Sequence, residues 1–331
     1  MTLPTILTGD RPTGPLHLGH YAGSLASRLK LQDSHRQFLL IADLQALTDN
    51  AGNPTKVRDN ILEVALDYLA VGLDRSTICL QSAMPALSEL TMLYMNHVTV
   101  SRLERNPTIR DEIESRGFGR DIPAGFLCYP VSQAADITAF RAGLVPVGED
   151  QAPILELARD IAGKVNRMAG CELLPLPQSM TTDSARLPGI NGQSKMSKSG
   201  GNALFLKSSP DEIRAAVKAM YTDPNHIRAS DPGTIEGNVV FACLDAFDPD
   251  SCVVADMKAR YRAGGLGDSV VKRRLEEVLQ EFLAPIRARR EVYAADKGEV
   301  LRILREGTAS AQALTQKTLE DVREALGVFT L

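Results

Sequence analysis

The chain has 331 residues, of which 44% are hydrophobic and 24% charged, and its formal net charge is −4. These proportions are ordinary for a globular protein, so they exclude an intrinsically disordered chain, a fibrous repeat and a disulfide miniprotein. At about 100 to 200 residues per domain, the length predicts two domains, or one domain with an appendage. No apolar run approaches the ~20 residues of a membrane span, so we expect no membrane association.

The cysteine content and the first ten residues indicate the cellular compartment in which the protein is expected. The five cysteines are an odd number, and no two of them form a Cys-x-x-Cys pair. We therefore expect a reducing cytoplasm and no cysteine-built metal or iron–sulfur site. The first ten residues lack a basic leader and a long apolar core, so we expect no secretory signal.

The first 190 residues alternate short apolar runs with longer helical patterns. We expect strands at 5–7, 38–42, 78–80 and 144–147. A loop rich in glycine and proline ends the first strand, and a helix follows it from about Gly19. A second helix begins at Pro54 with Asn53 as its cap, and another follows Gly148. This alternation predicts an α/β fold with a doubly wound, parallel, Rossmann-like sheet.

After about residue 205 the pattern becomes helical throughout. Helices are predicted at 210–220, 269–283, 285–295 and 311–326, the first of them capped by Ser209. The sequence thus predicts three parts: a sheet domain at 1–204, a smaller all-helical domain at 205–295, and C-terminal helices at 296–331. The last part can pack back on the sheet domain or stand apart from it.

Positive charge gathers in the helical part. Residues 251–306 hold 12 Lys and Arg against 9 Asp and Glu, a local charge of +3, whereas residues 1–250 hold 23 against 29. The basic residues cluster at 272–274 and 287–290. A solvated helix face is the favoured interpretation, and a face that contacts phosphates is the alternative.

The first candidate site follows the first predicted strand, in the segment PTGPLHLGH at 12–20. A helix that begins beyond a tight loop presents unpaired N–H groups and a positive dipole end, which suit a phosphate group. Gly19 has no side chain, so a flat ring can lie against its backbone. His17 and His20 are spaced to face the same way and to donate to phosphate oxygens. The alternatives are two surface histidines or a metal pair, for which no third ligand is evident.

The second candidate site is KMSKS at 195–199, flanked by Gly192 and Gly200. Two lysines on a loop between glycines can close on a triphosphate and neutralise the charge on a leaving pyrophosphate. An ordinary exposed polar loop is the alternative. The two segments, HLGH and KMSKS, together resemble the two signature sequences of class I aminoacyl-tRNA synthetases.

A third block narrows the resemblance. The sequences YPVSQAADI at 129–137 and VPVGEDQ at 145–151 are similar to blocks of the bacterial tryptophanyl-tRNA synthetases. The resemblance covers nearly the whole chain. It implies activation of L-tryptophan with ATP and transfer to tRNA(Trp), with Mg²⁺ carried on the triphosphate and no metal held by the protein. It also implies that residues 205–295 meet the anticodon and that the enzyme is a cytoplasmic homodimer.

The resemblance also implies roles for individual residues. Asp136 would accept the indole N–H, and a site built to bond its ligand can reject an analogue without the donor by ~10⁴–10⁵; a helix cap is the alternative role for Asp136. Tyr129 and Gln151 would hold the α-amino group, and Gln133 would line the tryptophan pocket. The implied ATP-binding residues are Arg11, Pro12, Thr13, Gly19, His20, Gly148, Glu149, Asp150, Leu187, Lys195, Met196, Ser197, Lys198 and Ser199. The implied catalytic residues are His17, His20, Lys195 and Lys198.

Several positions depart from the family's usual residues. Leu7 stands where an aromatic residue is common, Gln45 replaces a histidine, and Gln133 replaces a methionine. Arg110 stands about where a lysine contacts phosphate. These changes leave the reaction type unaltered but weaken the implied exclusive recognition of tryptophan.

Three other functions fit parts of the sequence. A tyrosyl-tRNA synthetase shares the fold and both signatures, and an aspartate receives a phenol as well as an indole. A non-catalytic paralogue that binds transfer RNA or a partner is the second alternative. A small nucleotidyltransferase would leave KMSKS and the helical part unexplained. The stretch 87–100, with Leu90, Met92, Leu93 and Met95, is either a dimer surface or ordinary core.

Overall fold

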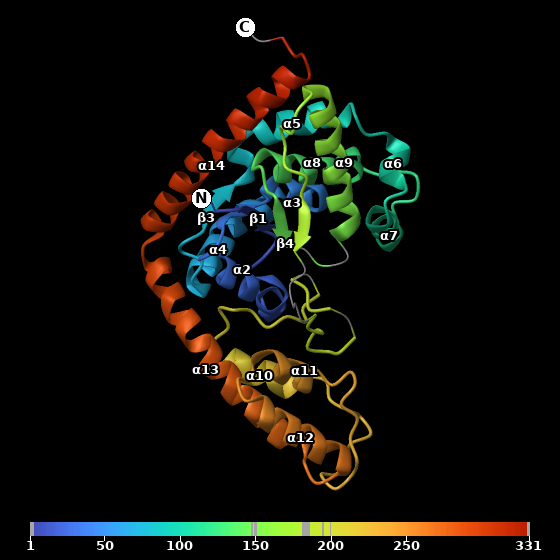
Figure 1. The fold of residues 1–331 in the computed structure, drawn as a ribbon. Coiled ribbons are helices and arrows are strands. Elements are labelled where there is room, and N and C mark those ends of the chain that lie inside the picture. The colour runs from blue at the N-terminus through green and yellow to red at the C-terminus, as the bar shows by residue number, and fades with distance from the viewer. Residues whose placement is uncertain are drawn as a thin grey trace.

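The computed structural model describes residues 3–146, 148, 151–180, 186–193, 195–198 and 200–329. Within these ranges, no helix is both long enough and apolar enough to cross a membrane. Figure 1 shows a sheet surrounded by helices, with a group of helices at one end and a long C-terminal helix running back along the sheet.

The sheet has five parallel strands in the order β3-β2-β1-β4-β5. The strands are β1 (Thr5–Asp10), β2 (Arg36–Ile41), β3 (Thr77–Leu80), β4 (Leu144–Pro146) and β5 (Gln178–Met180). The predicted doubly wound parallel sheet is confirmed. Of the expected strand at 144–147, residue 147 lies outside the described ranges. The sequence does not predict β5, because Gln-Ser-Met lacks the apolar and β-branched residues that mark a strand.

The helices of the first half connect the successive strands. They are α1 (Leu18–His20), the π-helical turn η1 (Tyr21–Leu25), α2 (Ala26–Leu31), α3 (Asp43–Asn50), α4 (Pro54–Val71), the 3₁₀ turn η2 (Gln81–Ala83), α5 (Pro85–Met95), α6 (Val100–Glu104), α7 (Pro107–Arg116), α8 (Ala124–Ala139) and α9 (Ala152–Ala169). Asn53 caps α4 as predicted, because its side chain accepts a hydrogen bond from the N–H of Lys56.

The second half is helical, as predicted, but two helices differ from the expectation. Its helices are α10 (Pro210–Ala219), α11 (Val239–Phe247), α12 (Ser251–Ala263), α13 (Asp268–Ala295) and α14 (Lys297–Ala325). The predicted break before Pro285 is wrong, since α13 continues through it; Leu283 and Ile286 are buried on either side and hold the helix in the core. The last helix starts at Lys297, 14 residues earlier than the predicted 311. The sequence does not predict this early part, because threonines such as Thr308 occupy positions of its buried stripe where apolar residues are expected.

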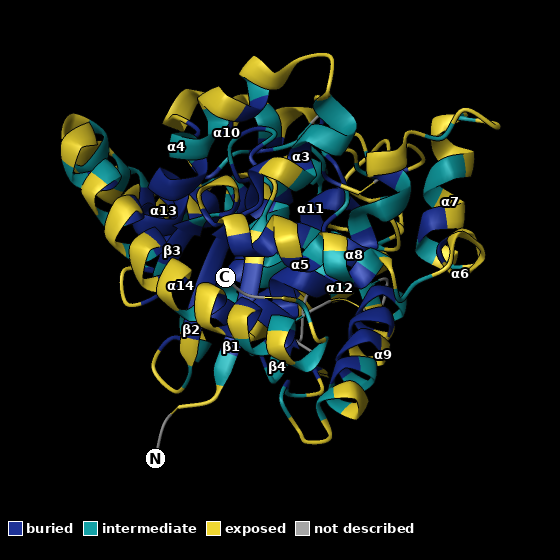
Figure 2. Cartoon of the chain, turned by 90° about the horizontal axis from the view of Figure 1, so that it is seen from above, coloured by how far each residue is buried: buried dark blue, intermediate teal, exposed yellow. Residues whose placement is uncertain are grey.

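Alternate side chains of β2 enter two separate apolar cores. Leu39 and Ile41 enter a core shared with α4 and with α10 to α13. Phe38 and Leu40 enter a second core shared with α5, α8, α9 and α14. Figure 2 shows the strands buried in the middle, between helices whose outward faces are exposed. Burial on both faces explains why β2 is a continuous apolar run.

The edge of the sheet at β3 is covered by α14. A Cβ atom added at Gly307 would lie 2.1 Å from the carbonyl oxygen of Ile78, so the helix and the strand touch backbone to backbone. The N–H of Leu80 donates to Thr308 Oγ1 at 3.1 Å. The helix therefore satisfies part of an edge that would otherwise be unpaired.

Most side chains of the two basic clusters, at 272–274 and 287–290, form contacts between one helix and another segment. Arg289 donates to the carbonyl groups of Ala70 and Val71 at the end of α4, and Arg274 forms two hydrogen bonds with Asp248. Lys272 donates to carbonyl groups at the end of α10. The favoured interpretation of a solvated face is therefore wrong for Lys272 and Arg274, which are partly buried, whereas Arg273 and Arg289 are exposed.

Candidate active site

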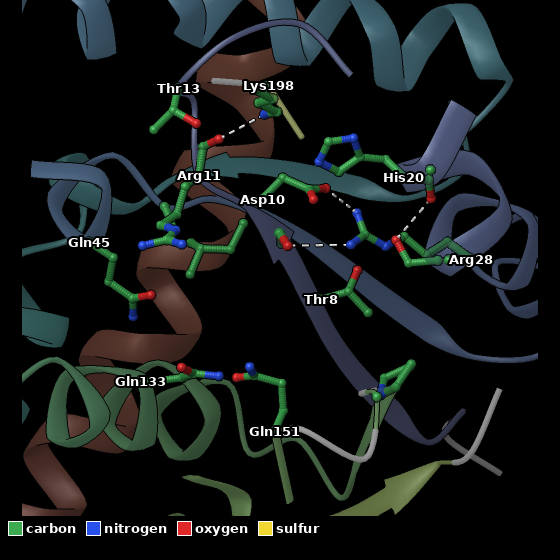
Figure 3. A pocket seen from close by; sticks show the side chains of 18 of the residues that line it. Thr8, Asp10, Arg11, Thr13, His20, Arg28, Gln45, Gln133, Gln151 and Lys198 are labelled. Atoms are coloured by element: carbon green, nitrogen blue, oxygen red, sulfur yellow. Dashed lines mark hydrogen bonds and ion pairs between the residues drawn. The ribbon is translucent and has the colours of Figure 1, made fainter. Parts of the chain in front are cut away.

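A cavity of about 650 Å³ lies beyond the carboxyl ends of β1, β2 and β4. This is the point at which the strand order reverses, since β2 and β4 lie on opposite sides of β1. Open parallel sheets bind their ligands in the crevice at such a point. Figure 3 shows two ends of the cavity: Lys198, His20, Asp10 and Arg28 gather at one end, and Gln45, Gln133 and Gln151 lie toward the other.

The HLGH segment forms one wall at the cationic end. The rings of His17 and His20 lie 3.8 Å apart between centroids, and His20 Nδ1 accepts a hydrogen bond from the backbone N–H of His17. A Cβ atom at Gly19 would lie 3.0 Å from the His17 ring, so the glycine admits this histidine. Burial lowers the pKa of His17 to about 4 and that of His20 to about 3. Both rings are therefore neutral at physiological pH and can still donate one N–H each.

The KMSKS segment forms the facing wall. The buried side chain of Asn202 orders it by accepting from the N–H of Ser197 and donating to the carbonyl group of Lys195. Lys198 Nζ donates to the carbonyl oxygen of Arg11 at 3.1 Å, across 187 residues of sequence. The two segments thus meet across one cavity.

A buried ion pair closes the end of β1 beneath these groups. Asp10 Oδ2 accepts from Arg28 Nη1 at 2.6 Å and from the Tyr68 hydroxyl at 2.7 Å. Although burial opposes ionisation of Asp10, the nearby positive charge of Arg28 outweighs it and lowers the pKa of Asp10 to about 2. In the described part of the chain, this wall of the cavity therefore carries a negative charge that is already paired.

The other end of the cavity is built on one face of α8. Tyr129, Gln133 and Asp136 are four and three residues apart, which places them on the same side of the helix. Asp136 is 3% exposed and accepts from Gln45 Nε2 at 2.6 Å and from Gln81 Nε2 at 2.9 Å. Burial raises the pKa of Asp136 to about 8, the Gln81 hydrogen bond opposes the rise, and the charge of Asp43 adds to it.

Tyr129 and two glutamines complete this end. The Tyr129 hydroxyl donates to Glu112 Oε2 on α7 at 3.1 Å. Gln133 and Gln151 point toward one another in Figure 3. The result is a buried carboxylate, a second carboxylate and several amide groups around the space that faces α8.

Most residues implied by the resemblance line this cavity. They are Arg11, Thr13, His17, Gly19, His20, Tyr129, Gln133, Asp136, Gly148, Gln151, Leu187, Lys195, Met196, Ser197 and Lys198. Pro12 is buried and does not line it, because the chain turns there. Arg110 does not line it either: its guanidinium group is exposed and lies 3.6 Å from Asp111. Glu149, Asp150 and Ser199 fall outside the described residues.

Some residues that line the cavity, or that bond a lining residue, carry a sequence signal that was not used above. Asp10 and Gln81 each lie at the carboxyl end of an apolar strand, where polar residues of parallel sheets face ligands. Arg28 and Glu112, which line the cavity, and Tyr68, which bonds Asp10, carry no such signal, since they lie within helices and not at strand ends.

Comparisons with known proteins agree on one family. The family model for tRNA synthetases class I (W and Y) matches residues 3–284. A tryptophan–tRNA ligase of Clostridium longisporum is 55% identical over 99% of this chain and 98% of its own length. A tryptophan–tRNA ligase of Streptococcus agalactiae is 51% identical over 99% of each chain. The solved tryptophanyl-tRNA synthetase of Campylobacter jejuni, in complex with ADP and tryptophan, has a TM-score of 0.84 and 29% identity, covering 98% of this chain and all of that one.

Proposed function

Because this chain belongs to the class I tRNA synthetases of the W and Y family, we propose that the cavity described above is its active site. The chain activates L-tryptophan with ATP to tryptophanyl adenylate, releases pyrophosphate, and transfers the tryptophanyl group to tRNA(Trp). The assignment of the site rests on the contact between Lys198 and Arg11. This contact brings KMSKS and the loop before HLGH to one cavity.

In the first step the tryptophan carboxylate attacks the α-phosphorus of ATP in line, and pyrophosphate leaves. No general base is needed, because a carboxylate is already ionised at neutral pH. Catalysis then consists of positioning and of stabilising the charge that develops on the phosphates. His17 and His20 donate neutral N–H groups to phosphate oxygens, while Lys195 and Lys198 neutralise the pyrophosphate.

Mg²⁺ enters with the triphosphate as part of the ATP substrate. Among the described residues, no group of three His, Cys, Asp or Glu side chains is placed to hold a metal ion. Among the described residues at the end of the cavity near Lys198, Asp10 is the carboxylate, and it is paired with Arg28. We propose that phosphate oxygens of ATP hold the Mg²⁺ ion.

The α8 end of the cavity takes the amino acid. Asp136 accepts the indole N–H, and Gln45 and Gln81 fix the orientation of its carboxylate. A carboxylate offers about four lone-pair positions, so it can bond both amides and the indole. Tyr129, Gln133 and Gln151 bound the rest of the space, and Glu112 places a negative charge where the α-ammonium group needs one.

Pyrophosphate exchange driven by each amino acid in turn tests this function. Tryptophan should support exchange, and tyrosine and phenylalanine should not. The matched variant Asp136→Ala should lose discrimination between tryptophan and an analogue in which sulfur replaces the indole N–H, by up to ~10⁴-fold. Exchange driven by tyrosine instead would overturn the substrate, and unchanged discrimination would remove Asp136 from selection.

The remaining parts of the chain have roles in tRNA binding and assembly. Residues 205–295 meet the anticodon, and Arg273 offers an exposed charge there. Two copies associate through the exposed side of α5, where Met92 is 60% exposed, and through the start of α6, where Val100 is 59% exposed. Leu90 does not belong to this surface, since it is buried in the core. Light scattering should give about twice the mass of 35.9 kDa, and a monomer mass would refute the dimer.

A further inference from the structure

Three segments around the active-site cavity meet at the side chain of Asp49, near the end of α3. Asp49 Oδ2 lies 2.6 Å from Nη1 of Arg11, in the loop that follows β1. Asp49 Oδ1 lies 3.1 Å from Nη2 of Arg116, at the end of α7. The side chain of Asp49 is 13% exposed, whereas those of the two arginines are 50% and 36% exposed. One mostly buried carboxylate therefore joins a loop that lines the cavity to helix α7.

Arg11 connects this carboxylate to the KMSKS segment. Its carbonyl oxygen accepts the hydrogen bond from Lys198 Nζ, and the residue lines the cavity. Figure 3 shows the Arg11 side chain between the end of the cavity that holds Lys198 and the end that holds Gln45. The backbone of Arg11 is thus held from the phosphate end, while its guanidinium group is held by Asp49. A ligand that fixes Lys198 therefore also restricts Arg11.

Helix α7 buries little of its own surface, so polar contacts decide its position. Ile109 alone is buried among the ten residues of α7, each of which the structure describes. Figure 1 shows α6 and α7 projecting from the body of the molecule. Glu112 Oε2 accepts from the Tyr129 hydroxyl at 3.1 Å, and the Arg116 guanidinium lies 5.3 Å from the centre of the Phe126 ring. Both partners belong to α8, so a shift of α7 would move Glu112 away from the amino-acid end of the cavity.

The ion pairs of Asp49 suit positioning better than stabilisation. Ion pairs with a partly exposed partner contribute little to the free energy of unfolding, and both arginines are of this kind. A carboxylate has two oxygens that can each bind one guanidinium group, so one side chain can fix two segments relative to each other. The effect of Asp49 is therefore expected in ligand binding more than in stability.

We propose that Asp49 is a positioning residue that couples the binding of ATP to the binding of tryptophan, an inference that rests on the proposed function. ATP holds Lys198 at its phosphates, and Lys198 holds Arg11. Arg11 orients Asp49, which retains Arg116 and with it the end of α7. Glu112 then stays at the amino-acid end, where it faces the α-ammonium group. Because both ligands favour the same arrangement, each tightens the binding of the other by the same factor.

The coupling is measured as a ratio of two dissociation constants. The Kd for tryptophan is determined alone and with a saturating ATP analogue whose α and β phosphates are joined by a methylene group, which prevents adenylate formation. In the wild-type chain the analogue should lower this Kd at least about fivefold. In Asp49→Ala and in Arg116→Ala the ratio should fall to about one. A merely structural role would raise both Kd values alike and leave the ratio unchanged.

A matched control removes another aspartate that pairs with an arginine. Asp111 lies on α7, is 71% exposed and pairs with Arg110 of the same helix at 3.6 Å, so Asp111→Ala should keep the wild-type ratio. The double variant Asp49→Ala/Arg116→Ala should lose no more than either single variant, since both remove one link. A ratio of about one in the wild-type chain, or a wild-type ratio in Asp49→Ala, would overturn the coupling. Failure of the wild-type chain to bind tryptophan would instead refute the proposed function itself.

Discussion

Asp67 and Arg290 form an ion pair of 2.9 Å between Oδ1 and Nε, although they are 223 residues apart in the sequence. The other oxygen of Asp67 accepts the backbone N–H of Leu16 at 2.7 Å, directly before His17. One fully buried carboxylate therefore joins helix α13 to the loop that carries the HLGH segment.

Removal of this carboxylate should weaken both the fold and the reaction. Asp67→Ala leaves the charge of Arg290 with Glu63 alone and leaves the N–H of Leu16 unpaired. Loss of one partner of a buried pair costs about 3 kcal/mol, which we expect as the fall in the free energy of unfolding in urea. Pyrophosphate exchange should also slow, because the HLGH loop loses an anchor. Asp59→Ala, at an exposed pair, is the control and should change neither quantity measurably.

The lysines of KMSKS should act on the reaction rate and not on amino-acid binding. Lys198 lies near Asp10 and both histidines at the phosphate end, and Lys195 lines the same cavity. Removal of one oriented group that stabilises transition-state charge typically slows a reaction by ~10²–10³. Lys198→Ala and Lys195→Ala should each lower the rate of pyrophosphate exchange by about this factor, with an unchanged KM for tryptophan. A normal rate in either variant would remove that lysine from the mechanism.

Tryptophan binding should depend on pH through Asp136. Burial raises the pKa of this carboxyl group to about 8 in the free protein, and the ionised form accepts the indole N–H more strongly than the protonated form. Affinity should therefore rise by up to about tenfold per pH unit from pH 6 and level off above about 8. The two histidines do not interfere, because burial lowers their pKa values to about 4 and about 3.

Fluorescence of the bound ligand measures this affinity, because the chain contains no tryptophan and excitation at the red edge of the indole band avoids its seven tyrosines. Asp136→Asn cannot ionise and is the matched control, for which the pH dependence should vanish. The same slope in the control would show that another group is responsible.

The contact between Gly307 and the sheet edge predicts a large effect of one methyl group. Gly307→Ala places a carbon about 2.1 Å from the carbonyl oxygen of Ile78, so α14 must shift from β3. Overpacking of this kind costs about 1–3 kcal/mol, measurable as a lower midpoint of urea unfolding. Gly125→Ala in α8 is the control, since nothing lies within 4 Å of its added carbon, and it should not destabilise the protein.

The sheet was predictable because both its faces are buried. The apolar run at 38–42 and the capping residues Asn53 and Ser209 are local signals, and β2, α4 and α10 lie where those signals place them. The course of α13 through Pro285 was not predictable, because it depends on cores to which distant segments contribute. The buried threonines of α14 likewise gain their environment only from the edge of the sheet.

The candidate site, too, could be predicted from the sequence only in part. HLGH and KMSKS are short contiguous segments, so the sequence shows them directly. The partners of Asp136 are not contiguous: Gln45 follows β2, and Gln81 follows β3, and only the parallel sheet brings them together. The ion pair of Asp10 with Arg28 could not be predicted for another reason. An arginine in a short helix is usually at the surface, and only the fold shows that Arg28 is buried.

The route of α14 sets an order of events during synthesis on the ribosome. The core between the sheet and α5 includes Ala311, Leu319 and Val322, which are translated after all five strands of the sheet. Until they leave the exit tunnel, the edge of β3 and one side of that core have no cover. The nascent N-terminal part therefore cannot reach the native state until residues 311–322 have been made. Until then its uncovered core can bind chaperones or aggregate.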